Sequence, residues 1–219
     1  KQKTAYEIRN CDWSSDVCSS DLIAWVEPGV VNLDLTKHLT PLGYHFAPDP
    51  SSQQVCTIGG NVGNNSGGPH CLAYGVTNAH ILAIEVVLAD GEVVTLGGLD
   101  AEPAGYDLRG VFVGGEGMLG ITTKVAVRIT PNPPAVRTLL LSFDTPRDAA
   151  ATVSAVIAAG IVPAAMEVMD QRITIAVENY VNVGYPKDAG AVLLAEVEDR
   201  KSTRLNSSHS SVSRMPSSA

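Results

Sequence analysis

The feature that most constrains this chain is a glycine-rich segment, residues 57–68, which includes five glycines and three asparagines and carries no formal charge. Glycine reaches positive φ angles and has no Cβ to hold a ligand away, so exposed backbone N–H groups can converge on an anion. Surface turns and linkers share this composition, but Ile58 and Val62 provide apolar anchors that a linker does not need. The segment therefore indicates an open backbone cradle for a diphosphate.

A second glycine cluster, residues 114–120, contains a GxGxxG pattern at Gly115, Gly117 and Gly120. In dinucleotide-binding βαβ folds these glycines follow a strand and begin a helix. Residues 111–113 favour a preceding strand, but residues 121–129 alternate apolar and polar side chains and predict another strand instead of a helix. The sequence context therefore excludes a Rossmann fold, while the two clusters together support a phosphate-binding function.

Five short motifs in order resemble a known family. They are PDPSS at 48–52, IGGN at 58–61, NSGG at 65–68, YG at 74–75 and GGEGMLGI at 114–121. Together they resemble the FAD-binding domain of the vanillyl-alcohol oxidase/para-cresol methylhydroxylase superfamily. Within it, the chain is similar to the group of the glycolate oxidase FAD subunit and the D-lactate and D-2-hydroxyglutarate dehydrogenases. The resemblance covers residues 22–200, although Gly115 and Thr122 stand where Ser and a β-branched apolar residue are usual.

The resemblance implies an α+β fold that binds FAD. Residues 22–134 are expected to form the second part of a PCMH-type FAD-binding domain, and residues 135–200 the start of a ferredoxin-like cap domain. Pro48 and Asp49 are expected to shape a turn, and Glu116 is expected to make either a structural hydrogen bond or a ribose contact. The expected cofactor-binding residues are Pro48, Asp49, Gly59, Gly60, Gly63, Asn64, Asn65, Ser66, Gly67, Glu116, Gly117, Gly120 and Ile121.

The same resemblance implies oxidation of a 2-hydroxy acid of the glycolate or D-lactate type to a 2-oxo acid. Electrons would pass to a non-oxygen acceptor, such as an iron–sulfur or quinone-linked subunit. Two alternatives stay open: another flavin oxidoreductase of the superfamily, such as a sugar-lactone oxidase, or a non-enzymatic nucleotide-binding module. The substrate and metal ligands of the relatives are expected beyond Arg200, and an early glycine loop before Leu22, so this chain alone is expected to be inactive.

The side chains between residues 22 and 200 suggest no further chemistry. His38 and His80 lack carboxylate or His partners at ligand spacing, and His70, next to Pro69 and Cys71, is expected to be structural. The sequence thus predicts no metal site and no cluster of His with carboxylates in this range. Catalytic residues are left unassigned.

Composition excludes several function classes. A net charge of −8 and a pI near 5.0 argue against binding to nucleic acid or to an anionic membrane surface. Cys56 and Cys71 lack the spacing of a zinc site and indicate a reducing compartment. No apolar run is long enough for a transmembrane helix. The chain is expected to be cytoplasmic, or peripheral to the inner membrane through a partner.

The two ends differ from the body. Residues 202–219 contain eight serines, whereas residues 22–200 contain five. Residues 1–21 include a near-repeat of WSSD and CSSD without an apolar period. Residues 1–21 and 201–219 are therefore predicted to be non-native or disordered sequence.

The body shows clear element signals. Residues 32–39 predict a helix, and residues 84–96 predict a hairpin around an Asp-Gly turn. After a boundary at three prolines (131, 133 and 134), the pattern predicts strand, helix, helix, strand. The expected strands are residues 138–143 and 191–197. The expected helices begin at the N-caps Thr145 and Asp170 and end at Gly160 and Val181.

Overall fold

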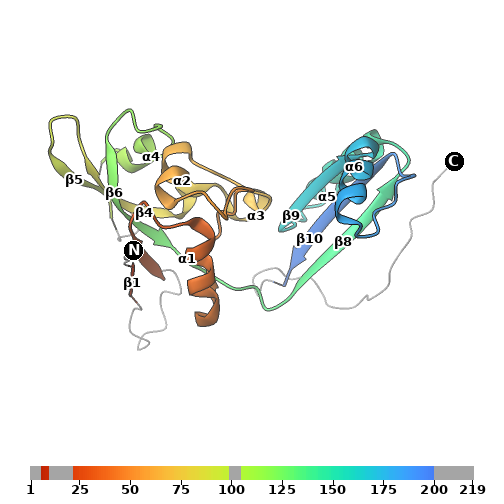
Figure 1. The fold of residues 1–219 in the computed structure, drawn as a ribbon, viewed down its shortest axis with the longest axis horizontal. Coiled ribbons are helices and arrows are strands. Elements are labelled where there is room, and N and C mark those ends of the chain that lie inside the picture. The colour runs from red at the N-terminus through yellow and green to blue at the C-terminus, as the bar shows by residue number, and fades with distance from the viewer. Residues whose placement is uncertain (1–5, 10–21, 99–104, 200–219) are drawn as a thin grey trace.

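The computed structural model describes residues 6–9, 22–98 and 105–199. They form two units, a first unit of residues 6–9, 22–98 and 105–131 and a second unit of residues 136–199, joined by residues 132–135 (Figure 1). The predicted domain boundary after residue 134 lies in this link. Each unit has its own β-sheet with helices packed against it, which agrees with the predicted mixed α+β class.

The main sheet has five strands in the order β1-β2-β6-β4-β5, and every neighbouring pair is antiparallel. These strands are β1 (Tyr6–Arg9), β2 (Ile23–Val26), β4 (Ile81–Val87), β5 (Val93–Gly97) and β6 (Ile121–Arg128). β4 and β5 form the predicted hairpin, with Val87 opposite Val93 and Gly91 at φ +87° in the turn. The strand predicted after the second glycine cluster is confirmed as β6.

The first unit also contains short helices. They are α1 (Asn32–Leu39), α2 (Ile58–Asn64), α3 (Cys71–Tyr74), α4 (Leu108–Phe112) and the 3₁₀ turns η1 (Thr40–Leu42) and η2 (Thr77–His80). The strands β3 (Tyr44–His45) and β7 (Thr130–Pro131) pair with each other at the edge of the unit. The helix predicted at residues 32–39 is confirmed. Leu35, Phe46, Ile58 and Val62 are almost fully buried and form a core with β4 and β6.

One local prediction in the first unit is wrong, and one helix was not predicted. Residues 111–113 do not form a strand, since the helix α4 begins at Leu108 behind an Asp107 N-cap. Residues 58–64, for which no element was predicted, form the helix α2, whose N-cap Thr57 accepts a hydrogen bond from the Gly60 N–H. Three glycines in seven residues disfavour a helix by propensity. Tertiary packing overrides that preference here, because the buried Ile58 and Val62 anchor the helix in the core.

The second unit contains one more strand than predicted. Its elements are β8 (Val136–Phe143), α5 (Pro146–Ala158), β9 (Ala165–Asp170), α6 (Gln171–Val181) and β10 (Ala191–Glu198). β10 lies between β8 and β9 and is antiparallel to both, which is a split β-α-β arrangement with α6 inserted before the third strand. The strand β9 was not predicted from the sequence. The predicted N-caps Thr145 and Asp170 are confirmed.

The predicted foreign or disordered ends lie mostly outside the described residues. Tyr6–Arg9 is the exception, because it forms strand β1 and pairs with β2 through residues 23–26. That strand differs from the expectation that residues 1–21 have no structure. Among the described helices, none is both long and apolar enough to cross a membrane.

Candidate functional site

A cavity of about 540 Å³ opens beside α2, where the two glycine clusters of the sequence meet. Its walls come from the turn after β2, from α2, from the end of α4, from the second glycine cluster and from the start of β6. Its size is in the range of pockets that hold small molecules and cofactors. The lining residues are Pro28, Gly59, Gly63, Asn64, Phe112, Glu116, Gly117, Gly120, Ile121 and Thr122.

Backbone hydrogen bonds hold the two glycine clusters together. The Gly114 N–H donates to the Val62 carbonyl at 2.8 Å, and the Glu116 N–H donates to the Gly63 carbonyl at 2.9 Å. These carbonyls belong to the last turn of α2, where backbone C=O groups need partners from outside the regular helix, and the Val62 carbonyl also accepts the N–H of the C-cap Asn65 at 3.4 Å. Gly114 and Gly117 adopt φ of +88° and +78°. The second cluster therefore folds back over the C-terminal end of α2 and forms one wall of the cavity.

The glycines of the cavity have two different roles. A Cβ on Gly59 would come within 2.7 Å of the Pro28 Cβ, and one on Gly120 would come within 2.6 Å of the Val87 carbonyl oxygen. Both positions need glycine for close backbone packing. A Cβ on Gly63 or Gly117 would meet nothing within 4 Å. These two glycines therefore leave open space where a ligand can approach the backbone.

The charge in the cavity limits how an anion can be held there. Among the lining residues Glu116 is the only ionisable one, and neither Lys nor Arg contributes. A diphosphate would have to be held by backbone N–H groups and the Asn64 amide, as a glycine-rich wall allows. The Glu116 carboxylate suits hydroxyl donors such as those of a ribose. Its own N–H is used structurally, toward Gly63. The residues present thus fit a dinucleotide whose diphosphate is held mainly by backbone N–H groups of the protein.

The structure brings seven of the thirteen predicted cofactor-binding residues to the cavity. They are Gly59, Gly63, Asn64, Glu116, Gly117, Gly120 and Ile121. Pro28, Phe112 and Thr122 line it as well but were not predicted. Thr122 lies two residues after the second glycine cluster and Phe112 two residues before it, so proximity to the cluster is the sequence signal for both. Pro28 is far from either cluster in the sequence.

The other six predicted residues do not line the cavity. Asn65 accepts a hydrogen bond from the Asn78 N–H at 2.8 Å, and the Ser66 carbonyl accepts the Thr77 hydroxyl at 2.7 Å. Gly67 packs closely against Cys71. These contacts tie the chain after α2 to η2 and α3. Gly60, Pro48 and Asp49 also lie away from the cavity lining, and the Pro48 carbonyl accepts the Asn32 amide at 2.9 Å.

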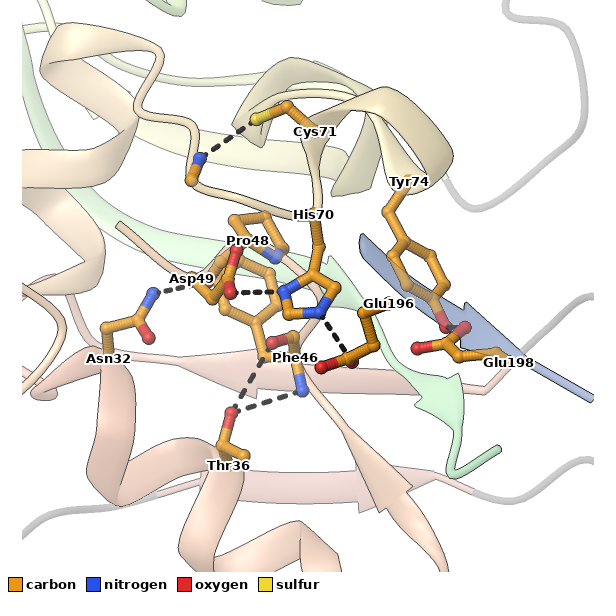
Figure 2. A network of polar contacts seen from close by, with 11 residues as sticks. Asn32, Thr36, Phe46, Pro48, Asp49, His70, Cys71, Tyr74, Glu196 and Glu198 are labelled. Atoms are coloured by element: carbon orange, nitrogen blue, oxygen red, sulfur yellow. Dashed lines mark hydrogen bonds and ion pairs between the residues drawn. The ribbon is translucent and has the colours of Figure 1, made fainter. Parts of the chain in front are cut away.

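A histidine and two carboxylates form a separate cluster where the two units meet (Figure 2). His70 Nδ1 lies 2.5 Å from Asp49 Oδ2, and His70 Nε2 lies 3.0 Å from Glu196 Oε1. The prediction that residues 22–200 contain no cluster of His with carboxylates is therefore wrong. Nothing in the sequence linked His70 to Glu196, because 126 residues separate them.

The electrostatics of this cluster favour a charged imidazole. Burial lowers the pKa of His70, but hydrogen bonds to Asp49 and Glu196 outweigh it and raise the pKa above 6.5. By contrast, burial lowers the pKa of His45 and of His80 below 6.5. His80 accordingly keeps a simple structural role, with Nε2 at 2.8 Å from the Tyr74 carbonyl. The surroundings of His70 thus favour a proton on both ring nitrogens.

Two family profiles match the chain. The profile described as "FAD binding domain" matches residues 9–97, and the profile described as "FAD linked oxidases, C-terminal domain" matches residues 132–219. The two matches fall on the first and the second unit in the order that the structure shows.

Curated relatives match most of the chain. The glycolate oxidase subunit GlcD of Escherichia coli (strain K12) is 48% identical over 175 residues, which are 80% of this chain and 35% of the relative. The subunit of the same name from Bacillus subtilis (strain 168) is 44% identical and covers 83% of this chain and 39% of the relative. A D-lactate dehydrogenase of Anaerostipes hadrus is 31% identical, and the match covers 84% of this chain and 40% of the length of that relative. The chain therefore spans well under half the length of these relatives.

A solved structure of alkyldihydroxyacetonephosphate synthase has the same fold, with a TM-score of 0.69. The match covers 81% of this chain and 35% of the chain in that structure. Its sequence identity is 22%, so the likeness concerns the fold alone. The profile matches, the identities to curated relatives and the shared fold agree with one another. The chain belongs to the FAD-linked oxidase family and carries its FAD-binding domain.

Proposed function

We propose that this chain is part of an FAD-dependent oxidoreductase that oxidises a 2-hydroxy acid, glycolate or D-lactate, to the 2-oxo acid. Electrons leave to an acceptor other than oxygen, through an electron-accepting partner subunit. The observation that carries this proposal is the cavity lined by both glycine clusters, in a chain 48% identical to a glycolate oxidase subunit. Support for D-lactate as the alternative acid comes from the 31% identity to a D-lactate dehydrogenase.

In this proposal the residues of the cavity bind and orient the cofactor. Gly63 and Gly117 leave room for close approach to the backbone, and Asn64 offers an amide. Glu116 accepts hydrogen bonds from sugar hydroxyls, and Ile121 contributes an apolar surface. FAD, when bound, supplies the hydride chemistry, and the protein supplies position and electrostatics. We assign no catalytic acid or base to this chain.

Two matched variants of α2 test the cofactor site. Gly63→Val places a side chain in the open space of the cavity, so we expect the FAD affinity to fall by about tenfold or more. Gly60→Val makes the same change one turn earlier, where a Cβ would meet the Thr57 hydroxyl at 3.5 Å, away from the cavity. Affinity is measured by the change in flavin fluorescence on titration, and far-UV circular dichroism checks that both variants are folded.

The pair also separates two versions of the assignment. The sequence assigns both glycines to the cofactor site, whereas the cavity includes only Gly63. A loss of FAD affinity in Gly63→Val alone supports binding of FAD in the cavity. Equal loss in both variants would favour the wider assignment made from the sequence, and unchanged affinity in both would overturn FAD binding here.

A chimera tests the activity. Residues 22–199 replace the aligned segment of the Escherichia coli glycolate oxidase subunit, and reduction of an artificial acceptor dye is followed with glycolate and with D-lactate. We expect turnover with at least one of the two acids, and none from this chain alone. A chimera that retains flavin but turns over neither acid would contradict the proposed substrate class while leaving the cofactor assignment intact.

A further inference from the structure

We propose that a protonated His70 fastens the second unit to the first, by donating one N–H to Asp49 and the other to Glu196, and that deprotonation of His70 releases this contact. The proposal concerns how the two units are coupled, and it does not depend on the cofactor or the substrate of the proposed function.

The contact joins three segments that are distant in the sequence. Asp49 follows β3, His70 immediately precedes α3, and Glu196 lies on β10 of the second unit. The imidazole stands between the two carboxylates, 2.5 Å from Asp49 and 3.0 Å from Glu196 (Figure 2). Each of these side chains is about one quarter exposed, with values of 26%, 21% and 27%. The pair of contacts is therefore shielded in part from solvent but accessible to protons.

The chemistry of the ring makes the contact depend on a proton. A neutral imidazole has one N–H donor and one acceptor nitrogen, and only the cation donates from both. Neutral His70 would therefore point a lone pair at one of the two carboxylates. Because the pKa of His70 is raised, the bridge is complete below 6.5 and is lost as the pH rises through the raised value.

The surrounding charges are mostly acidic. On β10, Glu198 lies beside the cluster and accepts the Tyr74 hydroxyl at 2.6 Å. On β3, the ring of His45 packs edge-on against Tyr74, and its pKa is lowered by burial. On β9, which packs against α3, Glu167 is exposed and Asp170 caps α6. The carboxylates near His70 thus favour its cation, and the neighbouring His45 tends to be neutral.

The same cluster raises the question of a metal ion. Ligand atoms of His70, Glu196 and Glu198 lie within 4.8 Å of one another. Both nitrogens of His70 already have carboxylate partners, however, and Glu198 accepts the Tyr74 hydroxyl. An ion would have to replace the bond between His70 and Glu196. The geometry therefore points to a proton as the bridging species, and the metal becomes an outcome of the test.

The bridge matters because it is one of the side-chain hydrogen bonds that cross between the units. Within the described residues, side-chain hydrogen bonds connect His70 to Glu196 and Tyr74 to Glu198. Both end on β10, on side chains two residues apart, which lie on one face of a strand. Losing the first bond leaves the second, from the Tyr74 hydroxyl, and the covalent link at residues 132–135. We expect the second unit then to move relative to the first.

The test uses the full chain in solution. The protonation of His70 is followed by NMR of the imidazole signals, and the separation of the units by the radius of gyration from small-angle X-ray scattering, from about pH 5 to about pH 9. For the unmodified chain we expect the radius to increase over the same pH interval in which His70 loses its proton.

Three variants make the test specific. Glu196→Gln should shift the pKa of His70 toward 6.5 and give the larger radius at every pH. His70→Arg keeps its charge across the whole range, so the smaller radius should persist at high pH. Glu167→Gln, an exposed glutamate on the neighbouring strand β9, is the control and should behave like the unmodified chain.

The outcomes are distinct. A radius that does not change with pH, together with an unshifted His70 in Glu196→Gln, would overturn the proposal even if His70→Arg failed to fold. Zinc titration followed by removal with EDTA gives the remaining arm. If EDTA abolishes the compact state below pH 6.5, a metal ion and not a proton bridges the units, and the proposal is overturned. If EDTA has no effect on the radius, the proposal is supported.

Discussion

The two units bury their apolar residues very differently. In the first unit, four of the seven residues of β4 are buried, and Ile84 has no exposed surface. In the second unit, most of β8 is exposed, and Leu139 has an exposed fraction of 49%. Ile84 and Leu139 are both large apolar residues within β-strands. The comparison shows that the first unit contains a core of its own, whereas the sheet of the second unit is covered only in part.

The residues buried in the second unit are also small. Its buried apolar side chains are Ala149, Ala164, Ala165, Ala191, Val192, Leu193 and Ala195. Since the free energy gained on folding scales with the apolar area removed from water, small side chains contribute little. Local hydrogen bonds at helix ends and turns should therefore account for a larger part of the stability of the second unit than of the first.

The largest predicted difference between the units comes from truncating one apolar side chain in each sheet. Ile84→Ala should lower the free energy of unfolding by about 2–5 kcal/mol, because it removes a fully buried side chain and leaves a cavity. Leu139→Ala should change it by less than about 0.5 kcal/mol, because half of that side chain is already in water. Urea unfolding followed by circular dichroism measures both. Comparable losses in the two variants would show that the face of β8 is covered in solution.

Most elements of both units could be predicted from the sequence, because their signals are local. The Asp-Gly turn between β4 and β5, and Thr145 followed by Pro146, each specify a structure within a few residues. β9 was missed because its sequence AMEVMD does not alternate clearly and directly precedes a helix cap. α2 was not predicted, because its glycines disfavour a helix by propensity, whereas Gly59 is required by the approach of Pro28. That requirement comes from packing between distant segments, which composition does not show.

The candidate site was predictable to a similar extent. Both glycine clusters could be recognised from the sequence, and their convergence follows from the bonds of Gly114 and Glu116 to the end of α2. The contribution of Pro28 to the cavity could not be foreseen, since no motif marks it. The pairing of His70 with Glu196 likewise depends on how the two units are placed. In both cases the missing information is the tertiary arrangement, not the chemistry of the residue.

A smaller effect on stability is expected in the turn after α6. There the carboxylate of one side chain accepts hydrogen bonds from backbone N–H groups. Glu178 accepts hydrogen bonds from the N–H groups of Val183, Gly184 and Tyr185, at 2.9 to 3.1 Å. The Tyr185 N–H contributes most to lowering the pKa of Glu178 below 4.5. The stability from these bonds is thus present above pH 4.5 and is lost as the pH falls through the lowered value.

Glu178→Gln should accordingly speed hydrogen exchange in the turn at neutral pH and remove the acid dependence of that exchange. Hydrogen-exchange mass spectrometry of peptides spanning residues 170–185 at neutral and acid pH, corrected for the intrinsic rate, reports both effects. Glu167→Gln, on the exposed side of β9, serves as the control. Equal acid dependence in the variant and the unmodified chain would show that another group is responsible.

The smallest predicted effect concerns two threonines of α5, which undergo the same change with different outcomes. Thr145 is the N-cap, and its hydroxyl oxygen accepts the Asp148 N–H at 3.2 Å. Thr145→Ala should therefore weaken the first turn by about 1 kcal/mol. The Thr152 hydroxyl donates to the Asp148 carbonyl, which already lies inside the helix, and alanine is the better helix former. Thr152→Ala should change the stability by less than about 0.5 kcal/mol in either direction.

Amide exchange in the first turn of α5 measures this difference. Ala149 is the buried residue of this helix, so tertiary packing offers little to compensate for a lost cap. A loss for Thr145→Ala with none for Thr152→Ala would mean that the second unit depends on local hydrogen bonds where the first depends on its core. If both variants exchange like the unmodified chain, α5 is held by packing after all, and the contrast between the two units is weaker than their burial indicates.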